Sequence, residues 1–126
     1  NNLTRAYEGK IFVQVYAQSG TASVYSSIHD QTFTYTKSWN VEVRLSYTVN
    51  VQTEKIGSIT GPSISLRPLY DEDLNNFRIS VQDMDAEKTS GDTHINIYIR
   101  YWLLANRYFP GYELVTFKPP AIQQYV

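Results

Sequence analysis

Residues 39–51 read WNVEVRLSYTVNV, and apolar and polar side chains alternate along them without a break. Such alternation is typical of a β-strand, because successive side chains of a strand point to opposite faces. It predicts one long strand with a buried face and a solvent-facing one. The side chains expected on the buried face are Trp39, Val41, Val43, Leu45, Tyr47, Val49 and Val51.

The same two-residue period recurs along the chain. Residues 10–17 form a predicted strand that would bury Ile11, Val13 and Val15 and turn Phe12, Gln14 and Tyr16 outward. Residues 18–30 and 83–92 are predicted loops, because they are polar and contain glycine, and residues 52–62 are a predicted connection. With further strands expected at 32–36, 63–69, 77–82, 95–105 and 112–117, the pattern predicts an all-β fold, an antiparallel β-sandwich of six to eight strands.

Length and composition restrict the classes of function. A chain of 126 residues is expected to form a single domain, residues 1–126. Its net charge of -1 argues against nucleic acid as a partner, since phosphate binding depends on clustered Lys and Arg. The chain has no Cys, so disulfides and thiolate metal sites are excluded. No apolar run approaches the roughly 20 residues needed to cross a bilayer, so we expect no membrane insertion.

The start of the chain suggests processing. Because it opens with Asn1 rather than Met, we expect a processed or excised product whose targeting segment, if any, has been removed.

Two groups of ionisable residues are candidates for catalysis or metal binding. Asp83 and Asp85 are a candidate carboxylate pair for acid–base chemistry or calcium binding, but their spacing matches no calcium loop, and a solvated hairpin loop is the alternative. His29 and His94 are the only histidines, too few for a zinc site without Cys. No Gly-x-Ser-x-Gly motif accompanies them. We therefore expect no metal, no cofactor and no enzymatic activity.

Aromatic residues make up 14% of the chain. Tyr16, Tyr98 and Trp102 fall opposite the predicted core side of their strands. Exposed rings supply contact area at low entropic cost, so they suggest a surface that contacts a sugar or another subunit. A core with two apolar faces is the alternative, and the pattern alone leaves both open.

Five sequence motifs resemble the H-type lectin domain, known from snail agglutinins and the discoidin C-terminal domain. They are RAYEGKI at 5–11, FTYTKSWNVEV at 33–43, the pair Leu66-Arg67, NNFRISV at 75–81 and INIYIRYWLLA at 95–105. The resemblance covers residues 5–105, and residues 107–126 form a C-terminal extension without a counterpart. The chain departs from the family where Met84 and carboxylates replace a Trp-His pair.

The resemblance implies a fold, a ligand and an assembly. It implies a six-stranded antiparallel sandwich that binds galactose or N-acetylgalactosamine-type sugars at clefts between the subunits of a trimer or hexamer. The sugar-binding residues it implies are Arg67, Asp83 and Asp85 in the loop 83–92, and Asp30. A glycan-binding homo-oligomer of this kind would be extracellular or surface-exposed.

Two other functions fit the same pattern. The first is a viral capsid or spike β-sandwich, in which the aromatic C-terminal segment would reach over a neighbouring subunit. Arg67 would then be buried in a subunit contact rather than lie in an open cleft. The second is a glycosidase using Asp83 and Asp85, whose carboxyl groups would have to face one groove about 5 to 9 Å apart.

Overall fold

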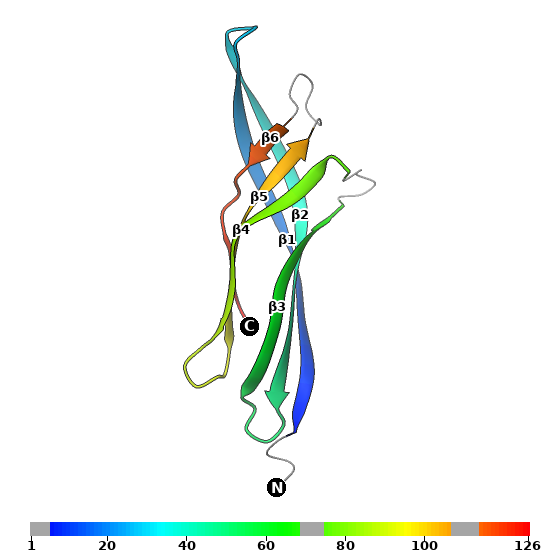
Figure 1. Cartoon of the computed structure of the whole chain (residues 1–126), viewed down its shortest axis with the longest axis vertical. Helices are drawn as coiled ribbons and strands as arrows, with labels where there is room; N and C mark the ends of the chain where they lie inside the picture. The colour runs from blue at the N-terminus through cyan, green and yellow to red at the C-terminus, as the bar shows by residue number, and fades with distance from the viewer. Residues whose placement is uncertain (1–5, 69–74, 107–113) are drawn as a thin grey trace.

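The computed structural model describes residues 6–68, 75–106 and 114–126, and these form two antiparallel sheets without a helix (Figure 1). The predicted all-β antiparallel sandwich is confirmed. Sheet A has the order β1-β2-β3, with β1 at Tyr7–Ser26, β2 at Gln31–Asn50 and β3 at Ile56–Arg67. In sheet B, β5 (Ile95–Asn106) pairs with β4 (Phe77–Lys88), β6 (Leu114–Phe117) and β7 (Ile122–Tyr125). Across the described ranges no helix is long and apolar enough to cross a membrane.

The core lies between the inward faces of β2 and β5. The predicted central strand is confirmed, because Trp39, Val41, Val43 and Leu45 are buried on β2. β5 contributes Ile95, Ile97, Ile99, Tyr101, Leu103 and Ala105, also as predicted from its alternation. Within residues 107–126, β6 and β7 bury Val115, Phe117 and Ile122 in the same core.

The hairpin of β1 and β2 is the longest feature of the molecule. The two strands pair from Tyr7 opposite Asn50 to Ser26 opposite Gln31 without a register shift. β3 ends at Arg67, opposite Asn40, so the hairpin beyond that point is a two-stranded ribbon. We call residues 18–39 the arm, and its tip projects beyond sheet B (Figure 1).

Both predicted loops are wrong over most of their length. Residues 18–26 continue β1, where hydroxyl groups pair across the hairpin in Thr21–Thr36 (3.3 Å) and Ser23–Thr34 (3.2 Å). Their small polar composition resembles a loop, but opposed Ser and Thr side chains are a normal cross-strand pair. Residues 83–88 likewise continue β4, and residues 56–62 of the predicted connection belong to β3.

The predicted orientation of β1 is also wrong. Phe12 and Tyr16 face the core, whereas Ile11, Val13 and Val15 point to solvent. Opposed residues of an antiparallel pair share a face, and Tyr16 lies opposite the buried Val41. Both faces of β1 are apolar, so alternation alone does not reveal which one is buried.

A buried hydrogen-bond chain joins the two sheets. The Trp39 Nε1–H donates to the Tyr101 hydroxyl (2.8 Å), which in turn donates to Gln18 Oε1 (3.1 Å). Burial raises the pKa of Tyr101 to about 12. The Tyr101 hydroxyl therefore provides hydrogen-bond partners for the Trp39 N–H and the Gln18 carbonyl oxygen, two groups of sheet A that face sheet B.

Tyr101→Phe should destabilise the fold by about 1 to 3 kcal/mol, because it leaves the buried Trp39 N–H without an acceptor. Denaturant unfolding followed by circular dichroism measures this loss. Tyr16→Phe is the matched control, since it removes the half-buried bond to Gln124 Oε1 (2.6 Å) and should cost only about 0.5 to 1.5 kcal/mol. Equal losses in the two variants would contradict the role given to Tyr101.

Alkaline pH should weaken the fold through the same hydroxyl. The unfolded chain releases the Tyr101 proton near pH 10, whereas the folded protein retains it until about pH 12. The free energy of unfolding should therefore fall as pH rises through this window, by up to about 2.7 kcal/mol from this residue. Unfolding curves at successive pH values should show a shallower decline in Tyr101→Phe, and identical slopes would refute the assignment.

Candidate functional site

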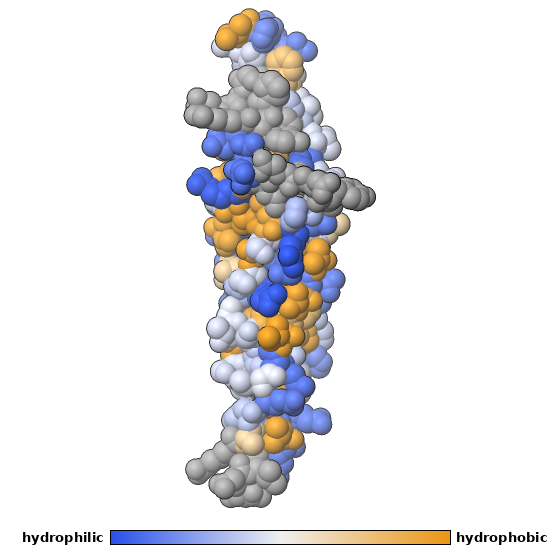
Figure 2. Space-filling model, turned by 90° about the vertical axis from the view of Figure 1, so that its right-hand side faces the viewer, coloured by the Kyte–Doolittle hydropathy of each residue, from blue (hydrophilic) through white to orange (hydrophobic). Residues whose placement is uncertain are grey.

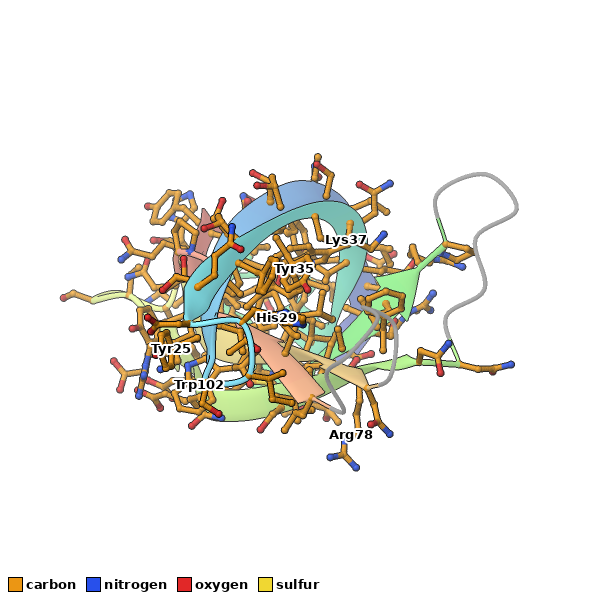
Figure 3. All side chains as sticks on the ribbon, turned by 90° about the horizontal axis from the view of Figure 1, so that it is seen from above. Tyr25, His29, Tyr35, Lys37, Arg78 and Trp102 are labelled. Atoms are coloured by element: carbon orange, nitrogen blue, oxygen red, sulfur yellow. The ribbon has the colours of Figure 1, made fainter. Side chains whose placement is uncertain are left out.

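The outer face of sheet B carries aromatic and charged side chains together. Among the residues that point away from the core are Ser80, Asp83 and Asp85 on β4, Tyr98, Arg100 and Trp102 on β5, and Gln123 and Tyr125 on β7. We call this set the sheet B face. Seen along the long axis, Trp102 lies on the sheet B side of the molecule and Arg78 projects outward from that side, whereas Tyr35 lies inside (Figure 3).

A β-bulge places the two carboxylates on this face. Up to Val81, opposite Tyr101, the odd-numbered residues of β4 face inward, and the register then shifts so that Asp83 lies opposite Arg100. An extra residue in one strand reverses the faces of every residue after it. Met84 therefore lies opposite the buried Ile99, and Asp83 and Asp85 point outward.

The rings lie between polar neighbours. Tyr98 lies opposite Asp85 on β4 and opposite Gln123 on β7, so its ring has a carboxylate on one side and an amide on the other. The ring of Trp102 has the ammonium of Lys118 4.5 Å from its centroid, a cation–π contact. Each ring is thus held in place while part of its surface stays accessible.

One end of the face is hollowed. A shallow pocket of about 450 Å³ is lined by Asn96, Ile97, Tyr98, Gln123, Gln124 and Tyr125. The ring of His94 stacks on Tyr125, with centroids 4.5 Å apart and planes 16° apart. The volume lies in the range usual for small-ligand sites, and amide and phenol groups line it.

Arg67 lies elsewhere, on the outer face of sheet A. Its side chain is 53% exposed, and its Nη2 atom lies 2.6 Å from Glu42 Oε1, while Arg44 Nη2 lies 3.6 Å from the other oxygen. The hydrogen bond from Arg67, with the charges of both arginines, lowers the pKa of Glu42. This guanidinium is therefore engaged in an ion cluster within the subunit, around a Glu42 side chain that is only 11% exposed.

Asp30 lies at the tip of the arm, in the left-handed conformation with φ of 48°. Its carboxylate accepts a hydrogen bond from the Tyr25 hydroxyl, which raises the pKa of Tyr25. Along β2, Asp30 is ten residues from Asn40, the partner of Arg67, which corresponds to about 33 Å. Of the four predicted site residues, one subunit brings together only Asp83 and Asp85.

The two histidines lie on different turns. His29 is in the tip of the arm, with its ring against Phe33 (centroids 6.0 Å apart), and His94 is in the turn between β4 and β5. Among the residues that the structure describes, no group of three or more His, Cys, Asp or Glu side chains is arranged to hold a metal ion.

Sequence reasoning identified Tyr98 and Trp102 as exposed rings but missed Arg100, Gln123 and Tyr125. One signal was available, because the apolar residues change from odd positions (Phe77, Ile79 and Val81) to even positions (Met84 and Ala86). That change indicates a bulge and a continuing strand. No comparable signal exists for β7, whose four residues follow two prolines and contain two glutamines.

Arg67→Ala should raise the pKa of Glu42 towards its ordinary value, because it removes the shortest hydrogen bond to that carboxylate. Nuclear magnetic resonance titration of the side-chain carboxyl measures the change. Arg44→Ala is the control and should raise it less, since Arg44 lies farther from the carboxylate. A larger effect of Arg44→Ala would show that the cluster is arranged differently in solution.

The chain was compared with protein families, with curated proteins and with solved structures. No family model, no curated protein and no solved structure matches it.

Proposed function

We propose that the chain is a non-enzymatic carbohydrate-binding module and that the sheet B face binds the sugar. The observation that carries this proposal is the combination of two rings, Tyr98 and Trp102, with the carboxylates of Asp83 and Asp85 and the guanidinium of Arg100 on one open face. The proposal keeps two of the residues implied by the lectin resemblance.

The chemistry of the face suits a sugar. A pyranose has an apolar C–H face that stacks on an aromatic ring, and hydroxyl groups that both donate and accept hydrogen bonds. Carboxylates accept from such hydroxyls, guanidinium donates to them, and hydrogen bonds with one charged partner are stronger than neutral ones. On this face, Tyr98 has a carboxylate and an amide on the adjacent strands, and Trp102 has the ammonium of Lys118 over its ring.

The spacing of the rings favours more than a monosaccharide. Tyr98 and Trp102 are four residues apart on β5, which corresponds to about 13 Å. A single sugar ring cannot contact both, so the face is proposed to bind a disaccharide or longer glycan. Galactose and N-acetylgalactosamine are the first sugars to test, since the lectin resemblance implies them.

The glycosidase alternative is less well supported. Asp83 and Asp85 lie on one side of one strand and are both exposed, so no groove separates two opposed carboxyls around a bond. Glycosidases place their two carboxyls on either side of the scissile bond, one acting as acid. The open face therefore favours binding without hydrolysis.

Assembly is proposed to strengthen this binding. Repeated weak sites on one homo-oligomer gain avidity, so a glycan-binding protein on an extracellular or exposed surface benefits from several copies. Arg67 and Asp30 would contribute to a sugar site only across a subunit boundary, because they lie far from each other and Arg67 lies on the opposite sheet from Asp83.

A viral spike or capsid component is the second candidate. The arm favours it, since a hairpin that projects beyond the sandwich resembles an element that reaches a neighbouring subunit (Figure 1). This candidate predicts assembly without glycan binding.

Trp102→Ala should weaken glycan binding by about 30-fold or more, the effect of losing a central aromatic contact worth at least about 2 kcal/mol. Asp83→Asn should weaken it by about tenfold or more through the loss of a charge-assisted hydrogen bond. A glycan array identifies the ligand, and calorimetry with that glycan measures both variants.

Tyr25→Ala is the matched control, since it removes an exposed ring from the tip of the arm and should leave affinity unchanged. Arg67→Ala separates the two possible locations of the site. Loss of binding in Arg67→Ala with none in Trp102→Ala would move the site to sheet A. No glycan signal from correctly folded protein would refute the sugar proposal.

A further inference from the structure

β1 has one free edge along sheet A. It pairs with β2 on one side, and no described residue forms a backbone hydrogen bond that joins the other side of β1 to another strand. The strand is 20 residues long and contains neither proline nor a register shift against β2. Soluble proteins normally interrupt such an edge with proline, a bulge or a cover, because unpaired backbone groups recruit another strand.

The same strand carries an exposed apolar row. Ile11, Val13 and Val15 are 64%, 43% and 47% exposed and point away from the core. The face shown in Figure 2 has apolar surface along the middle of its length, with polar surface around it. A free backbone edge and an apolar row on one strand point to a protein partner rather than to solvent alone.

We propose that β1 pairs antiparallel with β1 of a second copy, across a two-fold axis at Val13. Ile11 of each copy then faces Val15 of the other, and the two Val13 side chains face each other. The two three-stranded sheets become one continuous sheet of six strands. This inference is independent of the proposed sugar site, which lies on the other sheet.

A second copy fits this edge because the row Ile11-x-Val13-x-Val15 is symmetric about its centre. A shift of the register by two residues would leave Val15 opposite Gly9, and a shift by one would set Val13 beside an inward residue. In the symmetric register, Glu8 faces Gln18 and Lys10 faces Tyr16, so no like charges are opposed.

The contact has the number of hydrogen bonds and the anatomy of a specific interface. It pairs residues 7–19 of each copy and forms about twelve backbone hydrogen bonds, against about ten direct hydrogen bonds in a typical interface. The ion cluster of Glu42, Arg44 and Arg67 flanks the apolar row on β2 and β3, since Arg44 lies opposite Val13 and Glu42 opposite Val15. An apolar centre thus has a charged border, as specific interfaces do.

The two-fold pairing also limits the assembly. It is compatible with a dimer or a hexamer but not with an isolated trimer. It leaves both sheet B faces uncovered by the contact, so one dimer would present two sugar sites.

The first test measures mass by size exclusion with light scattering, using the full chain. The expected mass is twice the 14.5 kDa of one chain. Val13→Lys should halve it, because two ammonium groups would meet at the axis. Ser65→Lys is the matched control, since Ser65 points outward on β3, away from the edge, and should keep the doubled mass. A wild-type mass of one chain would overturn the proposal.

The second test does not depend on how Val13→Lys folds. The chain has no Cys, so Val13→Cys introduces a single thiol, and opposed side chains at the axis have Cβ atoms about 4.5 to 5.5 Å apart. Oxidation should cross-link most of the Val13→Cys protein into dimers. Ile11→Cys should not cross-link with itself, because the two Ile11 positions would be about 13 Å apart. Equal cross-linking of the two variants would overturn the register.

Discussion

The packing of the inward face of β2 on that of β5 is the contact on which the structure depends. Each strand contributes an unbroken row of buried side chains at alternate positions, from Trp39 to Leu45 on β2 and from Ile95 to Ala105 on β5. The hydrogen bond from Trp39 to Tyr101 lies in this layer and sets the two strands in one relative position. Every other strand that the structure describes pairs with β2 or with β5. The packing of β2 on β5 therefore also determines where the outer faces of the two sheets lie.

The parts of the fold that could be predicted are those that depend on local alternation. β2 and β5 each have one apolar and one more polar face, so their identity and buried side follow from the sequence. β1 could not be oriented, because Ile11 and Phe12 are both apolar and the choice depends on its register with β2. The arm was missed because its Ser and Thr residues are stabilised by partners that are distant in sequence.

The candidate site likewise has one part that the sequence predicts and one part that it does not. The rings of Tyr98 and Trp102 could be assigned to an outer face from the period of β5 alone. The neighbours that complete the face come from β4 and β7, and their positions depend on strand pairing that composition does not reveal. The separation of Asp30 from Arg67 follows from the length of the hairpin, which was predicted as two strands and a loop.

The bulge in β4 joins two stretches whose apolar residues fall at odd and at even positions. If Gln82 were paired with Arg100 in a regular ladder, every later residue of β4 would change face, and Met84 and Ala86 would replace the carboxylates on the outer side. Deletion of Gln82 would instead leave Asp83 opposite Arg100 and Met84 opposite Ile99, so the carboxylates would stay outward. The ligand chemistry of this surface therefore depends on Gln82 staying outside the ladder, and not on the length of the strand.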